Sequence, residues 1–184
     1  MPRRRATQAC GAHCRPVDMT SVLDLLCDHA IRGYEEPYKR EVIGVLLGRV
    51  RRDRSRSIVI ERAIPYRCRY RTRTKVDPHP ECLRRRARAL AARHGLAYLG
   101  CYHSHCEEAG SRSWALSAED WDIFLEDGRA LIEVVIGIDY AGKNARPAAG
   151  GRRRNRDGTL SYWRDGYYFR VTAQPRECRG IVSG

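Results

Sequence analysis

The stretch YLGCYHSHCEEAGSRSWALSAEDWDIF, residues 98–124, decides the fold. An apolar run ends in two histidines one residue apart, His103 and His105, and a Ser-x-x-Asp pair, Ser117 and Asp120, follows after a loop. Side chains i and i+2 of a β-strand point to the same face, so the two imidazoles are expected side by side. The stretch therefore predicts a strand, a loop and a helix, and it raises the question of whether these four residues form one site.

Size and composition predict one globular domain. The chain has 184 residues, of which 31% are charged and 42% hydrophobic, and domains typically span roughly 100–200 residues. The formal net charge of +13 comes almost entirely from arginine, since only three lysines are present. Arginine suits phosphate and carboxylate recognition, but a GC-rich genome gives the same bias, and we put that explanation first.

Nothing in the sequence predicts secretion or membrane insertion. The N-terminus MPRRRATQACGAHCRPVD has no apolar segment after its basic start. The longest apolar stretch, ALIEVVIGIDY, contains Glu133 and is too short to span a bilayer. We therefore expect a cytoplasmic protein with no membrane partner, whose eight cysteines are mostly reduced.

Hydrophobic periodicity and turn residues predict an α/β sandwich in which helices flank a mixed, mostly antiparallel sheet. Residues 1–16 are expected to form a disordered basic arm, residues 17–175 the domain, and residues 176–184 a tail. The predicted elements are helices at 20–33 (cap Ser21 with Asp24, end Gly33), 77–95 (cap Asp77, first-turn Pro78, end Gly95) and 117–128; a hairpin of strands 42–50 and 57–66; strands 96–105 and 130–140; a final hairpin at 159–172 around Asp165-Gly166; an exposed strand or mobile insertion at 66–76; and a mobile loop at 141–158.

The spacing of the polar residues suits a metal site. Zn²⁺ in catalytic sites takes three protein ligands and keeps a fourth position for water. His103 and His105 supply two nitrogens, and a loop can return Asp120 to them as the third ligand. Taken separately, each piece also has a structural interpretation: a His-x-His pair often binds nothing, and Ser117 with Asp120 matches a helix capping box.

Together, HSH followed by LSAED resembles the JAMM (MPN-plus) metalloprotease motif, His-Ser/Thr-His and then Ser-x-x-Asp. The family also has a glutamate before a Gly-x-Leu-x-Gly strand, and YKREVIGVLLG places Glu41 in the matching position. The resemblance runs from about residue 18 to 172 and implies the MPN/cytidine-deaminase-like fold. The overall character looks most like archaeal relatives of the proteasome-lid deubiquitinase.

The resemblance implies a zinc-dependent isopeptidase. His103, His105 and Asp120 would hold one Zn²⁺ and its water, Glu41 would take the proton of that water, and Ser117 would donate a hydrogen bond to the oxyanion. The chain departs from the family at Cys106, where proline is usual, and in a longer loop before Ser117. Cys106 is therefore a candidate regulatory residue, with a small buried residue as the alternative.

The implied substrate is ubiquitin or a ubiquitin-like protein, cut after its C-terminal Gly-Gly in a conjugate or a precursor. Such an extended tail can add as a strand to an exposed edge, and residues 66–76 are the expected edge. A proteasome or another AAA-type unfoldase complex is a further possible partner.

Two other functions compete with this one. A non-catalytic MPN scaffold has the same fold without the ligands, all of which are present here. Runs such as RVRRDRSR and GGRRRNRDG favour nucleic-acid binding, but no nucleic-acid module is recognisable. A solvated basic face, or one that meets an acidic protein partner, is the preferred interpretation.

Overall fold

The computed structural model describes residues 15–52, 56–76, 78–106, 115–142 and 151–178. Its elements follow in the order β1 (Val17–Asp18), α1 (Leu23–Glu35), β2 (Ile43–Val50), β3 (Ile58–Tyr66), α2 (Pro80–His94), β4 (Ala97–Cys106), α3 (Ala118–Glu126), β5 (Ile132–Tyr140), β6 (Arg152–Arg154), β7 (Leu160–Arg164), β8 (Tyr167–Pro175) and the short 3-10 helix η1 (Arg176–Cys178).

All eight strands join one sheet in the order β1-β3-β2-β4-β5-β8-β7-β6. The pairs β1·β3 and β4·β5 are parallel, whereas the other five pairs are antiparallel. The two central strands β4 and β5 carry the histidines and Glu133. This arrangement confirms the predicted mixed, mostly antiparallel sheet with flanking helices.

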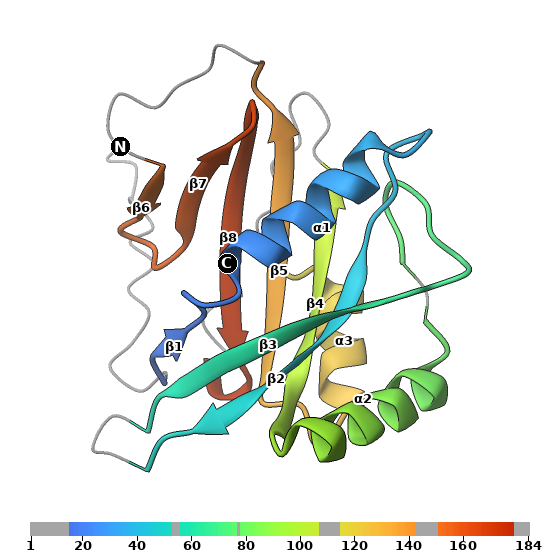
Figure 1. Cartoon of the computed structure of the whole chain (residues 1–184), viewed down its shortest axis with the longest axis vertical. Coiled ribbons are helices and arrows are strands. Elements are labelled where there is room, and N and C mark those ends of the chain that lie inside the picture. Colours follow the sequence, from blue (N-terminus) through green and yellow to red (C-terminus); the bar gives the residue numbers. More distant parts are fainter. Residues whose placement is uncertain (1–14, 53–55, 77, 107–114, 143–150, 179–184) are drawn as a thin grey trace, which may run out of the picture.

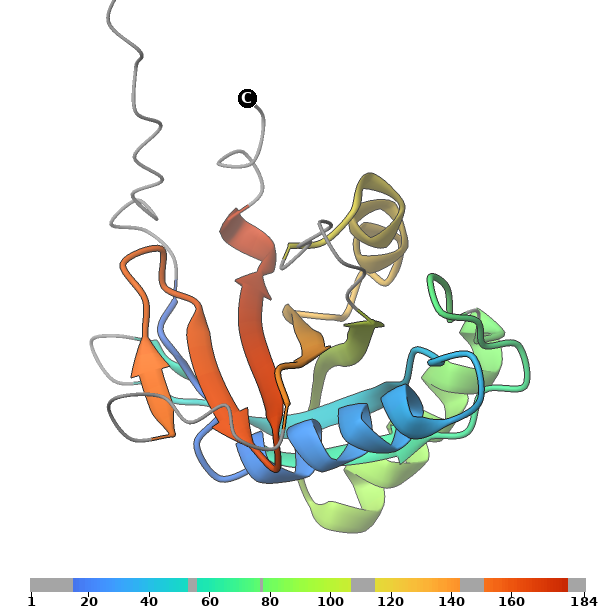
Figure 2. The same ribbon diagram turned by 90° about the horizontal axis from the view of Figure 1, so that it is seen from above.

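Helices cover both faces of the sheet. Helix α1 crosses one face and α3 lies on the opposite face (Figures 1 and 2). The main core cluster joins α1 to Ile132, Val134 and Ile136 of β5. Helix α2 packs on β2 and β4, while α3 packs on Val135 of β5. Because both faces of β5 are covered, its buried residues, apart from Glu133, are apolar on both faces rather than alternating with polar ones.

Both predicted hairpins are present. Strands β2 and β3 pair along their whole length, and β7 and β8 are joined by a tight turn. Asp165 (φ 53°) and Gly166 (φ 85°) both have positive φ, as a type I′ turn requires. The exposed strand considered for residues 66–76 is not formed: beyond Tyr66 this segment contains one isolated bridge, between Arg71 and Val76.

The helices differ from prediction at their ends. Helix α1 begins at Leu23 after Val22, because the Ser21 hydroxyl donates to Ile60 O of β3 instead of capping the helix. The helix continues two residues past Gly33. Glycine is needed at this position because a Cβ on it would lie 2.4 Å from Val42 Cγ1.

Helix α2 begins two residues later than predicted. Pro80, not Pro78, is its first residue, and His79 is the N-cap. The predicted cap Asp77 lies outside the described residues. Gly95 does end the helix, in the left-handed conformation with φ 61°, as expected for a C-cap glycine.

A bulge in β4 sets the side-chain directions near the site. Leu46 pairs with Gly100 but Leu47 pairs with Tyr98, so Leu99 is an extra residue on β4. Gly100 has φ 148°, and a Cβ on it would lie 1.8 Å from Ile132 O. The bulge turns Tyr98 and Cys101 to the same face, and the Tyr98 hydroxyl lies 3.3 Å from Cys101 Sγ.

The predicted boundaries fall largely outside the described residues. Of the expected basic arm, residues 1–14 lie outside them, and so do residues 143–150 of the expected loop 141–158. That loop contains the short strand β6. The domain was expected to end at residue 175, which is also the last residue of β8, and of the tail only η1 is described. None of the helices in the described ranges is long and apolar enough to cross a membrane.

Candidate metal centre

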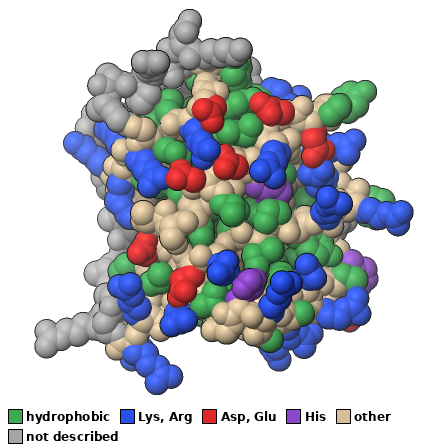
Figure 3. Space-filling view, viewed as in Figure 1, with side chains coloured by type: hydrophobic (Ala, Val, Ile, Leu, Met, Phe, Trp, Pro, Cys, Tyr) green, Lys and Arg blue, Asp and Glu red, His purple; other side chains and the backbone are tan. Residues whose placement is uncertain are grey.

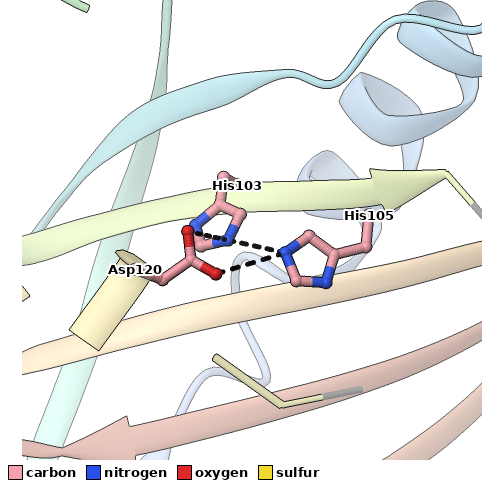
Figure 4. Close-up of side chains that lie close together, drawn as sticks. All are labelled: His103, His105 and Asp120. Atoms are coloured by element: carbon pink, nitrogen blue, oxygen red, sulfur yellow. Dashed lines mark hydrogen bonds and ion pairs between the residues drawn. The ribbon is translucent and has the colours of Figure 1, made fainter. Parts of the chain in front are cut away.

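His103 and His105 lie on β4 and point to the face covered by α2 and α3, and Asp120 reaches them from the first turn of α3 (Figure 4). The two Nε2 atoms are 3.0 Å apart. Asp120 Oδ1 is 3.6 Å from His103 Nε2, and Asp120 Oδ2 is 3.6 Å from His105 Nε2. The three predicted ligands are therefore brought together.

The ligand set fits a small tetrahedral cation. Zinc binds imidazole nitrogen and carboxylate oxygen at about 2.0–2.2 Å, which places two ligand atoms of a tetrahedral site about 3.3 Å apart. The three separations here, 3.0, 3.6 and 3.6 Å, lie on either side of this value. Two imidazoles and one carboxylate leave a fourth position open, as in catalytic zinc sites.

A helix cap orients Asp120. Asp120 Oδ2 accepts hydrogen bonds from Ser117 N at 2.8 Å and Ser117 Oγ at 2.6 Å, and Ser117 Oγ accepts from Asp120 N at 3.1 Å. This is a complete capping box. The structural interpretation of Ser117 and Asp120 and the metal interpretation therefore both hold, because the cap aims the carboxylate at the histidines.

Glu133 on β5 is a site residue that the sequence did not identify. Its Oε1 lies 3.1 Å from His103 Nδ1, and its side chain is buried. A carboxylate that accepts from Nδ1 leaves Nε2 as the ligand atom of the imidazole. The sequence signal was a single carboxylate in an apolar strand, and the register that pairs His103 with Val135 could not be read from it.

The charges around the histidines favour a cation. Burial lowers the pKa of His103, but hydrogen bonds to Asp120 and Glu133 outweigh burial and raise that pKa to about 10. Burial works against ionisation of Asp120 too, yet hydrogen bonds from both histidines hold its pKa far below the usual range. The site therefore stabilises positive charge between the imidazoles and the carboxylates.

Glu41 lies two residues before β2, close enough to His105 and His103 for its charge to interact with theirs, and it is 6% exposed. Two hydrogen bonds join its neighbour Val42 to β4: Ser104 N donates to Val42 O, and Val42 N donates to Ser104 Oγ. Burial raises the pKa of Glu41 to about 7, although His105 and His103 act in the opposite direction. A carboxyl group with such a pKa exchanges protons near neutrality.

The segment of residues 67–76 holds Glu41 and α3 in place. Glu41 N donates to Thr72 O at 2.8 Å. Arg71 Nη2 donates to both carboxylate oxygens of Glu36, and Lys75 Nζ is 2.7 Å from Glu119, the neighbour of Asp120. This segment therefore links the element that carries Glu41 to the helix that carries the carboxylate ligand.

Cys106 lies beside the site in sequence, but its side chain packs elsewhere. It alternates with His105 along β4 and belongs to the core cluster under α1, where it is 8% exposed. This placement supports the interpretation of Cys106 as a small buried residue.

Comparisons with known proteins bear on the family. Among solved structures, the chain is similar to protein DSY2949 from Desulfitobacterium hafniense, at 18% identity and a TM-score of 0.47, with 88% of this chain and 90% of that chain covered. No curated protein matches the chain. Residues 20–145 match a family model described as prokaryotic homologs of the JAB domain. That match covers more than half of the chain and includes all six predicted site residues, so the chain belongs to the JAB/MPN family of domains.

Proposed function

We propose that this protein is a zinc-dependent hydrolase that cleaves the peptide or isopeptide bond after the C-terminal Gly-Gly of a ubiquitin-like protein. The observation that carries the proposal is that Glu41, a buried carboxyl group whose pKa is raised to about 7, lies close enough to His103, His105 and Asp120 for its charge to interact with theirs. A non-catalytic scaffold needs neither the ligands nor the base.

His103, His105 and Asp120 would hold the zinc, which when bound lowers the pKa of water toward about 7 and polarises the scissile carbonyl. Glu41 would accept the proton of the attacking water and deliver it to the leaving amine. Glu133 would keep His103 oriented through its Nδ1.

Ser117 would stabilise the oxyanion of the tetrahedral intermediate. Its hydroxyl donates to Asp120 Oδ2 in this structure, so the O–H bond has to rotate toward the oxyanion. Ser117 N still donates to the same Asp120 oxygen after this rotation, so Asp120 keeps its orientation. Loss of such an oxyanion donor costs about 3 kcal/mol of transition-state stabilisation.

For the basic surface we favour an acidic protein partner over a nucleic acid. Arginine and lysine side chains spread over the face shown in Figure 3, and acidic side chains lie among them rather than apart. Salt bridges among the described residues include Arg152 with Asp24 and Arg164 with Asp28. Arginines already paired with carboxylates add little attraction for phosphates.

Cleavage of a model substrate tests the proposal. A ubiquitin-like protein extended past its terminal Gly-Gly would be incubated with the zinc-loaded chain, with Glu41→Gln, and with a chelated sample. Cutting after the second glycine that is lost in both controls is the expected result. An active Glu41→Gln protein would remove Glu41 from its role, and a zinc-loaded chain that cuts no such fusion would contradict the proposed substrate class.

A further inference from the structure

A pocket between α2 and α3 extends from the candidate metal centre, with a volume of about 220 Å³. His103, Asp120 and Glu133 form its inner end, so whatever occupies the pocket lies against the ligands. Most of the remaining wall is apolar and includes Ile43, Val76, Leu83, Ile123, Phe124 and Ala130; its charged members are Arg84, Glu126 and Asp127. We call this pocket, together with the hollow next to it, the α2–α3 cleft.

The floor of the cleft is rigid. The Tyr98 hydroxyl donates to Asp127 Oδ2 at 2.7 Å and lies 3.3 Å from Cys101 Sγ, an arrangement that depends on the β4 bulge. The Arg176 side chain donates to Phe124 O at 2.8 Å and to Ala130 O at 2.7 Å, which fixes the end of α3 and the turn after it. The cleft is thus formed before any ligand arrives.

The far end of the cleft is lined by arginine. A second hollow of about 240 Å³ shares Arg84, Tyr98 and Asp127 with the first pocket and adds Arg88 and Arg129. Among the residues that the structure describes, none of these three arginines forms a salt bridge. Asp127 is the one acidic residue of this hollow, so the positive charge there exceeds the negative.

The dimensions and the charge identify the occupant. The first pocket is smaller than the roughly 300–1,000 Å³ of pockets that hold whole small-molecule ligands, so it suits a single side chain. Its apolar wall favours an aliphatic or aromatic group, and the planar guanidinium groups beyond it match a carboxylate. An apolar residue followed by an acidic residue has both features.

We propose that the α2–α3 cleft is a substrate subsite that recognises a peptide segment with an apolar side chain next to the metal centre and a carboxylate beyond it. This inference rests on the proposed function, because it assigns the peptide to the hydrolase's own substrate. It adds a specificity that the metal centre alone does not provide.

Binding of short peptides to the zinc-loaded full-length chain tests the subsite without requiring cleavage. The probes are N-acetyl-Leu-Glu-amide, N-acetyl-Ser-Glu-amide and N-acetyl-Leu-Lys-amide, titrated by calorimetry. We expect the first to bind at least about tenfold more tightly than either of the others, since an apolar side chain in a fitted pocket is worth roughly 10–200-fold. Equal binding of the leucine and serine probes, or no binding of any probe, would overturn the proposal.

Charge reversal gives a sharper test. The double variant Arg84→Glu/Arg88→Glu should lose at least about tenfold in affinity for the glutamate probe and gain affinity for the lysine probe. The matched control is Arg85→Glu/Arg86→Glu, two exposed arginines of the same helix that do not line the cleft. Equal effects of the two pairs would refute a role of the cleft arginines.

These binding results separate the two proposals. If the probes bind as expected but no ubiquitin-like fusion is cleaved, the subsite stands and the proposed substrate fails. If the fusion is cleaved while the probes show no selectivity, the hydrolase stands and the subsite is wrong.

Discussion

Replacement of Glu133 by glutamine tests how the histidines are held. Glu133 Oε1 lies 3.1 Å from His103 Nδ1 in a buried environment, so the carboxylate both fixes the imidazole and offsets the charge of a bound metal. Glutamine has nearly the same shape and leaves no cavity, but it removes the charge. Loss of such a partner weakens metal binding by about 10–100-fold, which corresponds to about 1.4–2.7 kcal/mol.

Zinc affinity measured by competition with a chromogenic chelator gives the result directly. The matched control is Glu126→Gln, an exposed residue of α3 that also lines the cleft. Without metal, Glu133→Gln should also lower the free energy of unfolding, because it removes one of the two carboxylates that stabilise the charged, buried His103 imidazole. A zinc affinity within twofold of the unmodified chain would refute the orienting role of Glu133.

Three further predictions concern the cap, the pH dependence and the β4 bulge. Ser117→Ala removes the hydroxyl of the capping box and should lower the free energy of unfolding by about 1 kcal/mol. Urea denaturation measures this loss, and an unchanged free energy of unfolding would argue against the cap. The pKa of His103 is raised to about 10, so the stability that charged His103 gives the metal-free protein is complete below pH 6.5 and is lost as the pH rises toward 10. The melting temperature should therefore fall with pH across this window, and it should fall less steeply in His103→Gln. Equal slopes of melting temperature against pH for the two proteins would contradict this prediction. Gly100→Ala places a Cβ against Ile132 O at positive φ and should lower the free energy of unfolding by on the order of 3 kcal/mol. The control Gly128→Ala, whose Cβ would meet nothing within 4 Å, should change the urea midpoint little. Equal losses of stability in the two variants would show that the close approach at Gly100 is not required.

The sequence predicts most of the framework because its signals are local. The β-rich runs on either side of the charged turn RRDRSR and the Asp165-Gly166 turn correctly predict both hairpins. The errors arise from contacts between distant segments. Ser21 has the right spacing for a helix cap, but it donates to Ile60 on the neighbouring strand.

At the site, too, the sequence predicts the residues that local structure orients but not those that distant segments bring in. The motif brings His103, His105 and Asp120 together as expected, because a strand end and a helix cap fix their directions. Glu133 enters only through the parallel pairing of β4 and β5. The anchoring of α3 by Arg176 likewise depends on a residue about fifty positions away in the chain.

The most direct test of the account is the metal content of the purified protein. Elemental analysis with X-ray absorption should find one zinc per chain, bound by two imidazoles and a carboxylate, in the unmodified protein. Asp120→Ala and a His103→Ala/His105→Ala variant should lose that zinc while remaining folded by circular dichroism. Zinc retained equally in all three proteins, or absent from the unmodified chain after zinc has been supplied, would contradict the assignment of this cluster as the metal centre.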